Sequence, residues 1–178
     1  MRLPQLEDLP SPAGKHVLVR CDLNVPLSPD GSIEDDLRIR SSVPTLQWLV
    51  DRGATVTACT HLGRPHGAPS AATDVAPVRD RLASLVPGVA LLDNLRWDPG
   101  EERNDAAFVD RLVAGQDLYV DDAFGSAHRA HASIVGPPAR LPSAGGRLLA
   151  REVDVLGTLL ESPKRPFVAV LGGSKVSD

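Results

Sequence analysis

"HVLVRCDLNV", residues 16–25, is a mostly apolar, β-branched run that ends in polar residues just before Pro26. Such a run predicts a buried strand followed by a loop. "ATVTACT", residues 54–60, predicts a second strand, and it leads into "HLGRPHGAPSAAT", a loop rich in Gly, Pro and Ala. Between the two strands, apolar residues recur at the spacing of a helix: Ile39, Val43, Leu46 and Leu49. The chain therefore opens with a strand, a helix and a second strand.

The alternation of helix and strand continues along the rest of the chain. Further helices are predicted over residues 76–86, 104–115 and 144–160, and further strands over 89–95, 117–125 and 167–175. Asn104 is placed to cap the second of these helices and Gly115 to end it. Alternating elements with short connections predict a parallel sheet covered by helices on both faces. We therefore expect an α/β fold, a three-layer doubly wound parallel sheet.

Composition and charge exclude several classes of protein. The 178 residues are 42% hydrophobic and 24% charged, which suits one ordinary globular domain with a short extension. A net charge of −4 argues against a nucleic-acid or membrane-surface partner. No apolar run is long enough to span a membrane and the first residues do not resemble a signal peptide, so we expect a soluble, cytoplasmic protein. Cys21 and Cys59 lack the spacing of metal ligands, and no metal site is predicted.

Polar and cationic residues follow each of the predicted strands. They are Asp22 and Asn24 after the first strand, His61 and Arg64 after the second, Arg96 after the third, and Asp122, His128, Arg129 and His131 after the fourth. In a doubly wound sheet the ligand lies at the carboxyl ends of the strands. Arginine presents a planar fork of donors that suits phosphate or carboxylate, and histidine adds a further donor. The pattern therefore predicts a site for a small, multiply charged anion.

Each of these residues also has an alternative role that needs no ligand. Arg20 could be a solvated edge residue or pair with Asp22, Arg38 could pair with Asp35 or Asp36, Arg96 could pair with Asp93 or Glu101, His61 and Arg64 could lie on a flexible loop, and His128 and His131 could lie on an exposed helix face. Surface ion pairs of this kind contribute little to stability. The recurrence of basic residues after consecutive strands favours a shared site.

Longer motifs resemble the phosphoglycerate kinase family. They are "VRCDLNVPL", "DDLRIR", "HLGRP", "NLRWDPGEERND", "YVDDAFGSAHRAHASIVG", "AGGRLLAREVDVL" and "RPFVAVLGGSKVSD", in the family's order and spanning nearly the whole chain. The resemblance is to the N-terminal, substrate-binding half. It implies two α/β domains that close on each other and transfer a phosphoryl group between 1,3-bisphosphoglycerate and ADP, giving 3-phosphoglycerate and ATP in glycolysis, with Mg²⁺ bound to the nucleotide.

The same resemblance implies roles for particular residues. The residues implied to bind substrate are Arg20, Asp22, Leu23, Asn24, Arg38, His61, Leu62, Gly63, Arg64, Arg96 and Arg129. Arg38 and Lys175 are implied to stabilise the transferring phosphoryl group, and Gly172, Gly173 and Lys175 to contact the nucleotide. Phosphoryl transfer requires mainly positioning and charge stabilisation, which an arginine-rich site supplies.

The chain also departs from the family pattern in two ways. Only "VPG" separates the helix at 76–86 from the strand at 89–95, where the family has a further strand and helix, so one βα unit is expected to be missing. The sequence ends shortly after "GGSK", before most of the family's nucleotide site. We therefore expect a phosphoglycerate-binding domain over 1–145, an interdomain helix over 146–162, and the first strand and Gly-Gly turn of a truncated nucleotide domain over 163–178.

These departures leave three functions open. The chain is a phosphoglycerate kinase that is inactive alone because it is truncated, a non-catalytic module that binds 3-phosphoglycerate or a similar anion, or a decayed gene product. The expected state is a monomer, or a chain completed by a separate chain that supplies the nucleotide domain.

Overall fold

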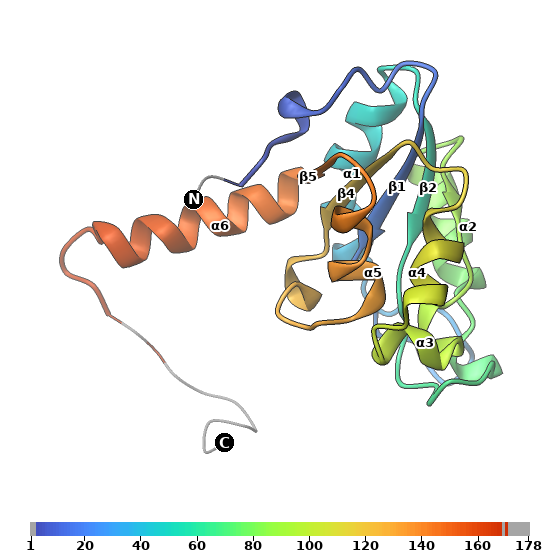
Figure 1. The fold of residues 1–178 in the computed structure, drawn as a ribbon. Coiled ribbons are helices and arrows are strands. Elements are labelled where there is room, and N and C mark those ends of the chain that lie inside the picture. Colours follow the sequence, from blue (N-terminus) through green and yellow to red (C-terminus); the bar gives the residue numbers. More distant parts are fainter. Residues whose placement is uncertain (1–2, 169, 171–178) are drawn as a thin grey trace.

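The computed structural model describes residues 3–168 and residue 170, and its centre is a sheet of five parallel strands (Figure 1). The strands are β1 (His16–Cys21), β2 (Thr55–Cys59), β3 (Ala90–Leu91), β4 (Leu118–Asp122) and β5 (Ser143–Gly145). Their order across the sheet is β3-β2-β1-β4-β5. The chain builds outward from β1 to β3 and then returns to β4 on the other side of β1. This reversal of direction beside β1 is where a doubly wound sheet forms its ligand crevice.

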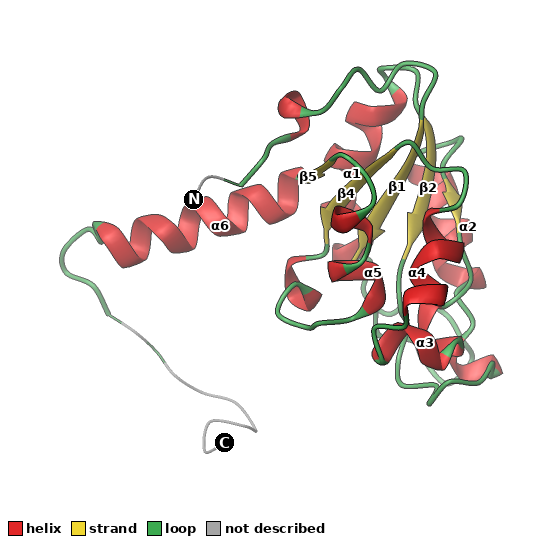
Figure 2. Cartoon of the chain, viewed as in Figure 1, coloured by secondary structure: helices red, strands yellow, loops and turns green. Residues whose placement is uncertain are grey.

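Helices cover both faces of the sheet, as the colouring by secondary structure shows (Figure 2). The helices are α1 (Leu37–Val50), α2 (Ala76–Leu85), α3 (Pro99–Glu102), α4 (Ala106–Val113), α5 (Ala132–Val135) and α6 (Arg147–Glu161). On one face, α1 and α2 pack on strand residues such as Val17, Val19 and Val120. On the other face, Leu18 and Tyr119 contact α4 and α5. Successive strand residues point to opposite faces, so both faces are apolar and both need a helical layer. The predicted three-layer α/β fold is confirmed.

Several predicted boundaries were wrong in detail. β1 ends at Cys21, and residues 22–25 continue as a loop that carries polar side chains to the sheet edge. The N-cap of α4 is Asp105, whose carboxylate accepts a hydrogen bond from Phe108 N at 2.9 Å, whereas Asn104 has a φ of 53° and belongs to the preceding turn. β5 was not predicted because Ser, Ala and Gly carry no strand signal. The strand predicted at 167–175 falls mainly outside the described residues.

α6 leaves the sheet at the end of β5 and projects away from the rest of the molecule (Figure 1). Its first turn is held by side chains of two other elements: Thr45 Oγ1 accepts from Arg147 N at 2.8 Å, and Asp122 Oδ1 accepts from Leu148 N at 2.9 Å. Leu149 and Ala150 are buried, but the apolar residues farther along α6 are exposed: Val153, Val155, Leu156, Leu159 and Leu160. The helix is therefore anchored only at its beginning.

The connection between α2 and β3 is short. Residues 86–89 join the two elements directly, with no strand or helix between them. Within the described residues β3 pairs with β2 and with no other strand, so its outer edge is unpaired. This is the arrangement expected if one βα unit is missing.

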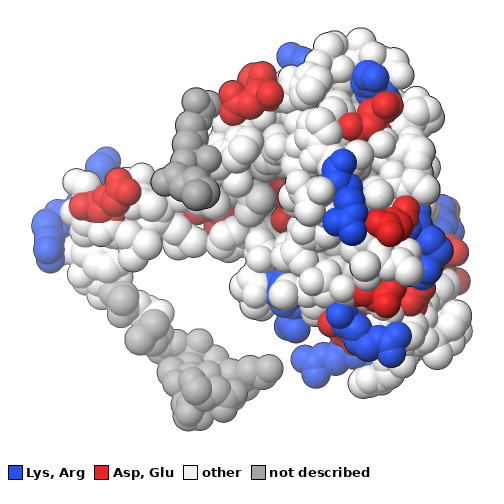
Figure 3. All heavy atoms as spheres, viewed as in Figure 1, with Lys and Arg blue, Asp and Glu red and all other residues white. Residues whose placement is uncertain are grey.

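Charged side chains are mixed over the surface. On the face in Figure 3, basic and acidic residues lie beside one another and do not form one large area of either sign. Among the described residues, no helix has the length and hydrophobicity needed to cross a membrane.

Candidate anion-binding site

A polar pocket of about 230 Å³ lies at the carboxyl ends of the central strands. Its lining consists of Asp22, Asn24, Arg38, His61, Gly63, Arg64, Arg96, Gly125, Ser126 and Arg129. Asp22 and Asn24 follow β1, the residues from His61 to Arg64 follow β2, Arg96 lies in a turn after β3, and Gly125, Ser126 and Arg129 follow β4. Residues more than 100 positions apart in the chain thus meet because parallel strands end at the same edge of the sheet.

Most of the predicted site residues line this pocket, but not all. Leu23 and Leu62 are buried in the apolar core instead. Gly125 and Ser126 were missed, although their position directly after β4 was a usable signal. Asp122 is the last residue of β4, and His128 and His131 follow the strand, but none of the three lines the pocket.

Asp22 and Arg38 form an ion pair on one side of the pocket. Arg38 Nη1 lies 2.5 Å from Asp22 Oδ2, so the alternative pairing of Arg38 with Asp35 or Asp36 is wrong. Asp36 is occupied by Arg40 and Arg81. Half of the Arg38 side chain is exposed, which leaves part of its guanidinium open toward the pocket.

The loop after β2 is held by two hydrogen bonds to Gly63. Gly63 N donates to Asn24 Oδ1 at 2.8 Å, and Arg96 Nη1 donates to Gly63 O at 3.1 Å. Gly63 has a φ of 62°, a left-handed conformation that glycine adopts without strain. Asn24 and Arg96 therefore both line the pocket and position the backbone that carries His61 and Arg64.

Two arginines at the pocket have no anionic partner. Among the described residues, Arg64 and Arg129 make no hydrogen bond or ion pair with their side chains. Arg96 lies 3.3 Å from Glu102 and not against Asp93 or Glu101, and burial lowers its pKa. Since Asp22 is the only carboxylate among the described residues that line the pocket, their net charge is positive.

Arg20 lies behind the pocket and does not line it. Its side chain is 1% exposed, and it is neither a solvated edge residue nor a partner of Asp22. It donates instead to Ser133 Oγ, to the carbonyl of Cys21 and to His61 Nδ1. His61 does line the pocket, and it is buried, not part of a solvated loop. Burial, together with the positive charges of Arg20 and Arg96, lowers the pKa of His61 to about 2.

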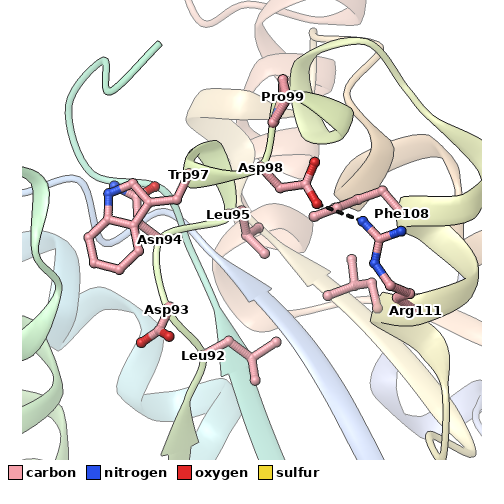
Figure 4. Close-up of a pocket in the computed structure, with 10 residues that line it drawn as sticks. Leu92, Asp93, Asn94, Leu95, Trp97, Asp98, Pro99, Phe108 and Arg111 are labelled. Carbon is pink, nitrogen blue, oxygen red and sulfur yellow. Dashed lines mark hydrogen bonds and ion pairs between the residues drawn. The ribbon is translucent and has the colours of Figure 1, made fainter. Parts of the chain in front are cut away.

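A second, larger hollow of about 590 Å³ lies near the unpaired edge of β3 (Figure 4). Its walls are formed by the segment after β3 and by α4, with Leu92, Leu95 and Phe108 among the apolar side chains. Its charged groups are already paired: Arg111 Nη2 lies 2.6 Å from Asp98 Oδ2, and Asp93 pairs with Arg79 outside it. Within the described part of the chain, this hollow has no unpaired cation among its lining residues and does not suit an anion.

The remaining predicted residues cannot be placed. Lys175, Gly172 and Gly173 lie outside the described residues. In the part of the chain that the structure describes, no three His, Cys, Asp or Glu side chains gather in a way that could hold a metal ion. Cys21 and Cys59 are free, buried thiols, and burial raises the pKa of both.

Comparison with known proteins identifies the family. The family model described as phosphoglycerate kinase matches residues 6–89 and 83–178. The chain belongs to the phosphoglycerate kinase family. It is 49% identical to the phosphoglycerate kinase of Salinispora arenicola, in an alignment that includes 100% of this chain and 52% of that enzyme. It is 51% identical to the phosphoglycerate kinase of Thermomicrobium roseum, in an alignment that includes 92% of this chain and 48% of that enzyme. The chain thus spans about half the length of the phosphoglycerate kinases that it matches.

Solved phosphoglycerate kinase structures have the same fold. The structure of the Coxiella burnetii enzyme superimposes with a TM-score of 0.87 at 36% identity, over 99% of this chain and 50% of that one. The alignment with the Salinispora arenicola relative extends over 209 positions, although this chain has 178 residues. About thirty positions of that phosphoglycerate kinase therefore have no counterpart here. The two family matches overlap at 83–89, the junction of α2 and β3 where a βα unit was expected to be missing.

Proposed function

We propose that the pocket binds 3-phosphoglycerate and 1,3-bisphosphoglycerate, and that the protein acts as a phosphoglycerate kinase in glycolysis. Family membership supports the reaction class, because the curated relatives carry that name. The observation that carries the proposal is the pair of guanidinium groups, Arg64 and Arg129, that line the pocket and have no hydrogen-bond or ion-pair partner among the described residues. Both side chains are exposed, so their planar donor groups have no competing partner in the protein and are available for charge-assisted, bidentate hydrogen bonds to a phosphate or carboxylate.

The arrangement suggests how the work is divided among the residues. Arg64, Arg96 and Arg129 would hold the carboxylate and the 3-phosphate, since a phosphorylated acid offers an anionic group at each end. Arg38 would turn its exposed side toward the transferring phosphoryl group, with Asp22 keeping the guanidinium in place. Transfer of a phosphoryl group depends on this kind of positioned positive charge.

The described residues do not form a site for the nucleotide or its Mg²⁺. Of the described residues that line the pocket, Asp22 alone is a carboxylate, and it is paired with Arg38, so this donor set does not suit a divalent cation. Gly172, Gly173 and Lys175 are proposed to contact ATP or ADP. We propose that this chain alone binds phosphoglycerate without turning over ATP, and that turnover requires the remaining nucleotide-binding residues, in the same or a separate chain.

Isothermal titration of the 178-residue chain with 3-phosphoglycerate tests the proposal. We expect saturable binding with 1:1 stoichiometry, weakened by about tenfold or more in Arg64→Gln and in Arg129→Gln, because each change removes a charge-assisted donor. Arg151→Gln is the matched control, since Arg151 is exposed on α6 and has no ion pair among the described residues. The proposal is wrong if 3-phosphoglycerate does not bind, or if Arg151→Gln weakens binding as much as the pocket variants. A coupled assay with MgATP tests turnover, and activity of this chain alone would contradict its proposed dependence on further residues.

A further inference from the structure

We infer that Arg20 is a positioning residue that holds His61 as a neutral imidazole with its proton on Nε2, so that the ring donates one fixed hydrogen bond into the pocket. Arg20 Nη2 lies 3.0 Å from His61 Nδ1. A guanidinium can only donate, so Nδ1 must be the acceptor and must lack a proton. A neutral imidazole that accepts at Nδ1 carries its proton at Nε2.

The guanidinium of Arg20 is fixed in its orientation, because its other two nitrogens also donate hydrogen bonds. Its Nε donates to Ser133 Oγ at 2.9 Å, and its Nη1 donates to the carbonyl of Cys21. The side chain is 1% exposed, so no water competes for these donors. Arg20 is thus held in one orientation, with the remaining nitrogen directed at His61.

A buried carboxylate on the far side balances the charge of Arg20. Glu101 is fully buried, and its two oxygens accept from Ser133 N at 2.9 Å and from Ser133 Oγ at 2.6 Å. Since Ser133 Oγ donates to Glu101, its lone pair is free to accept from Arg20 Nε. Arg20 therefore donates on both sides, to Ser133 Oγ and to His61 Nδ1, and Ser133 in turn donates to Glu101.

The opposite nitrogen of the ring is the one available to a ligand. His61 lines the pocket, whereas Arg20 does not. Nε2 has no hydrogen-bond partner among the described residues. The fully buried side-chain atoms that lack a partner do not include it, so Nε2 is accessible from the pocket. The charged and titratable groups that act on the ring are Arg20, Arg96, His131 and Arg129, and the arginines and burial all oppose its protonation. The donor at Nε2 is therefore present across the physiological pH range without a second charge.

This inference rests on the proposed function only for the identity of the ligand that accepts from Nε2. The tautomer itself is measured without any ligand, by the ¹⁵N chemical shifts and ring correlations of the His61 imidazole in the free 178-residue chain. We expect the Nε2–H pattern with no titration between pH 5.5 and 8. An Nδ1–H pattern, or a titration in that range, would overturn the inference whether or not 3-phosphoglycerate binds. Failure of 3-phosphoglycerate to bind would overturn the proposed function and leave the imidazole spectrum to decide the inference.

Variants separate positioning from a general structural role. Glutamine places an amide N–H near the position of Nε2, and asparagine places one near that of Nδ1. We expect His61→Gln to bind 3-phosphoglycerate within about threefold of wild type and His61→Asn to bind about tenfold more weakly.

A double variant tests Arg20 itself: Arg20→Met combined with Glu101→Gln removes the donor to His61 without leaving an unpaired buried charge. In this double variant we expect the single tautomer to be lost and 3-phosphoglycerate binding to depend on pH between 5.5 and 8. Equal binding by His61→Gln and His61→Asn, or an unchanged tautomer in the folded double variant, would contradict the role given to Arg20. If the double variant does not fold, the wild-type ¹⁵N spectrum and the two His61 variants still test whether His61 donates from Nε2.

Discussion

Arg38 in the first turn of α1 and Asp22 in the loop just after β1 form an ion pair, with Nη1 2.5 Å from Oδ2, directly against the backbone of Gly125. A Cβ built on Gly125 would overlap Asp22 Oδ2 and lie 3.7 Å from Arg38 Nη1. The loop after β1, the first turn of α1 and the turn after β4 can thus approach one another closely because residue 125 has no side chain. The geometry of the Asp22–Arg38 ion pair therefore depends on a glycine at position 125, more than eighty positions away in the chain.

Replacing Gly125 by alanine should displace this ion pair. We expect Gly125→Ala to weaken 3-phosphoglycerate binding by about tenfold, through the misplaced Arg38, and to lower the free energy of unfolding by about 1–3 kcal/mol from the overlap. Titration calorimetry and urea unfolding measure the two effects. The control is Gly157→Ala in α6, where a Cβ meets open space. It should leave binding unchanged and stabilise the helix by about 0.5–1 kcal/mol. Normal binding by Gly125→Ala would show that the Asp22–Arg38 geometry does not matter to the ligand.

His61 should make the protein less stable in acid. Its pKa of about 2 in the folded state lies below the value of 6.5 expected when it is solvated. The unfolded chain therefore takes up the proton first, and the contribution of His61, complete above about pH 6.5, is lost as the pH falls, by up to about 1.4 kcal/mol per pH unit. Urea unfolding of wild type and His61→Gln at pH 7.5, 6.0 and 5.0 measures this loss. The variant should show the shallower dependence on pH, and equal slopes would contradict the assignment.

Asp122 should have the opposite effect on the pH dependence of stability, favouring the folded state in acid. Burial raises the pKa of this carboxyl to about 6 from 3.8, so the folded state binds the proton more tightly. The stabilising contribution of the protonated group is present below about pH 4 and is lost as the pH rises to about 6.

The variant Asp122→Asn removes this titration. It keeps an oxygen that can accept from the N–H groups of Leu148 and Leu149 at the start of α6. Relative to wild type, we expect the variant to gain about 1–3 kcal/mol of stability between pH 4 and pH 6.5, measured by urea unfolding at each pH. Any fixed cost of the new amide cancels in this difference. A relative stability that does not change with pH would mean that Asp122 ionises normally in the folded state.

The two ends of α6 should differ in their contribution to stability. Leu149 is 7% exposed and packs at the anchored end, whereas Leu156 is 43% exposed on the projecting part. We expect Leu149→Ala to lower the free energy of unfolding by about 2–4 kcal/mol and Leu156→Ala by less than about 0.5 kcal/mol. The same substitution at both sites makes each the control for the other in urea unfolding. A large cost at Leu156 would mean that the apolar face of α6 is covered in solution.

Much of the fold could be predicted from local patterns. The β-branched runs at β1, β2 and β4 and the helical spacing in α1 and α4 identify these elements, because buried strands and amphipathic helices have distinct periodicities. β5 could not be predicted, since Ser143, Ala144 and Gly145 carry no strand propensity and pair with β4 only because the chain returns there. The N-cap of α4 differs by one residue from the prediction because Asn104 and Asp105 are both good caps and only the backbone conformation distinguishes them.

The sequence by itself determined the α/β class and brought Asp22, Asn24, His61, Arg64, Arg96 and Arg129 to one edge of the sheet, because parallel strands of one layer end on the same side. Only the tertiary structure decided what each side chain does there. It pairs Arg38 with Asp22, leaves Arg64 and Arg129 without a partner, and places Arg20 behind His61 and away from the pocket. These choices depend on burial and on contacts between residues 16 to 113 positions apart, which no local pattern records.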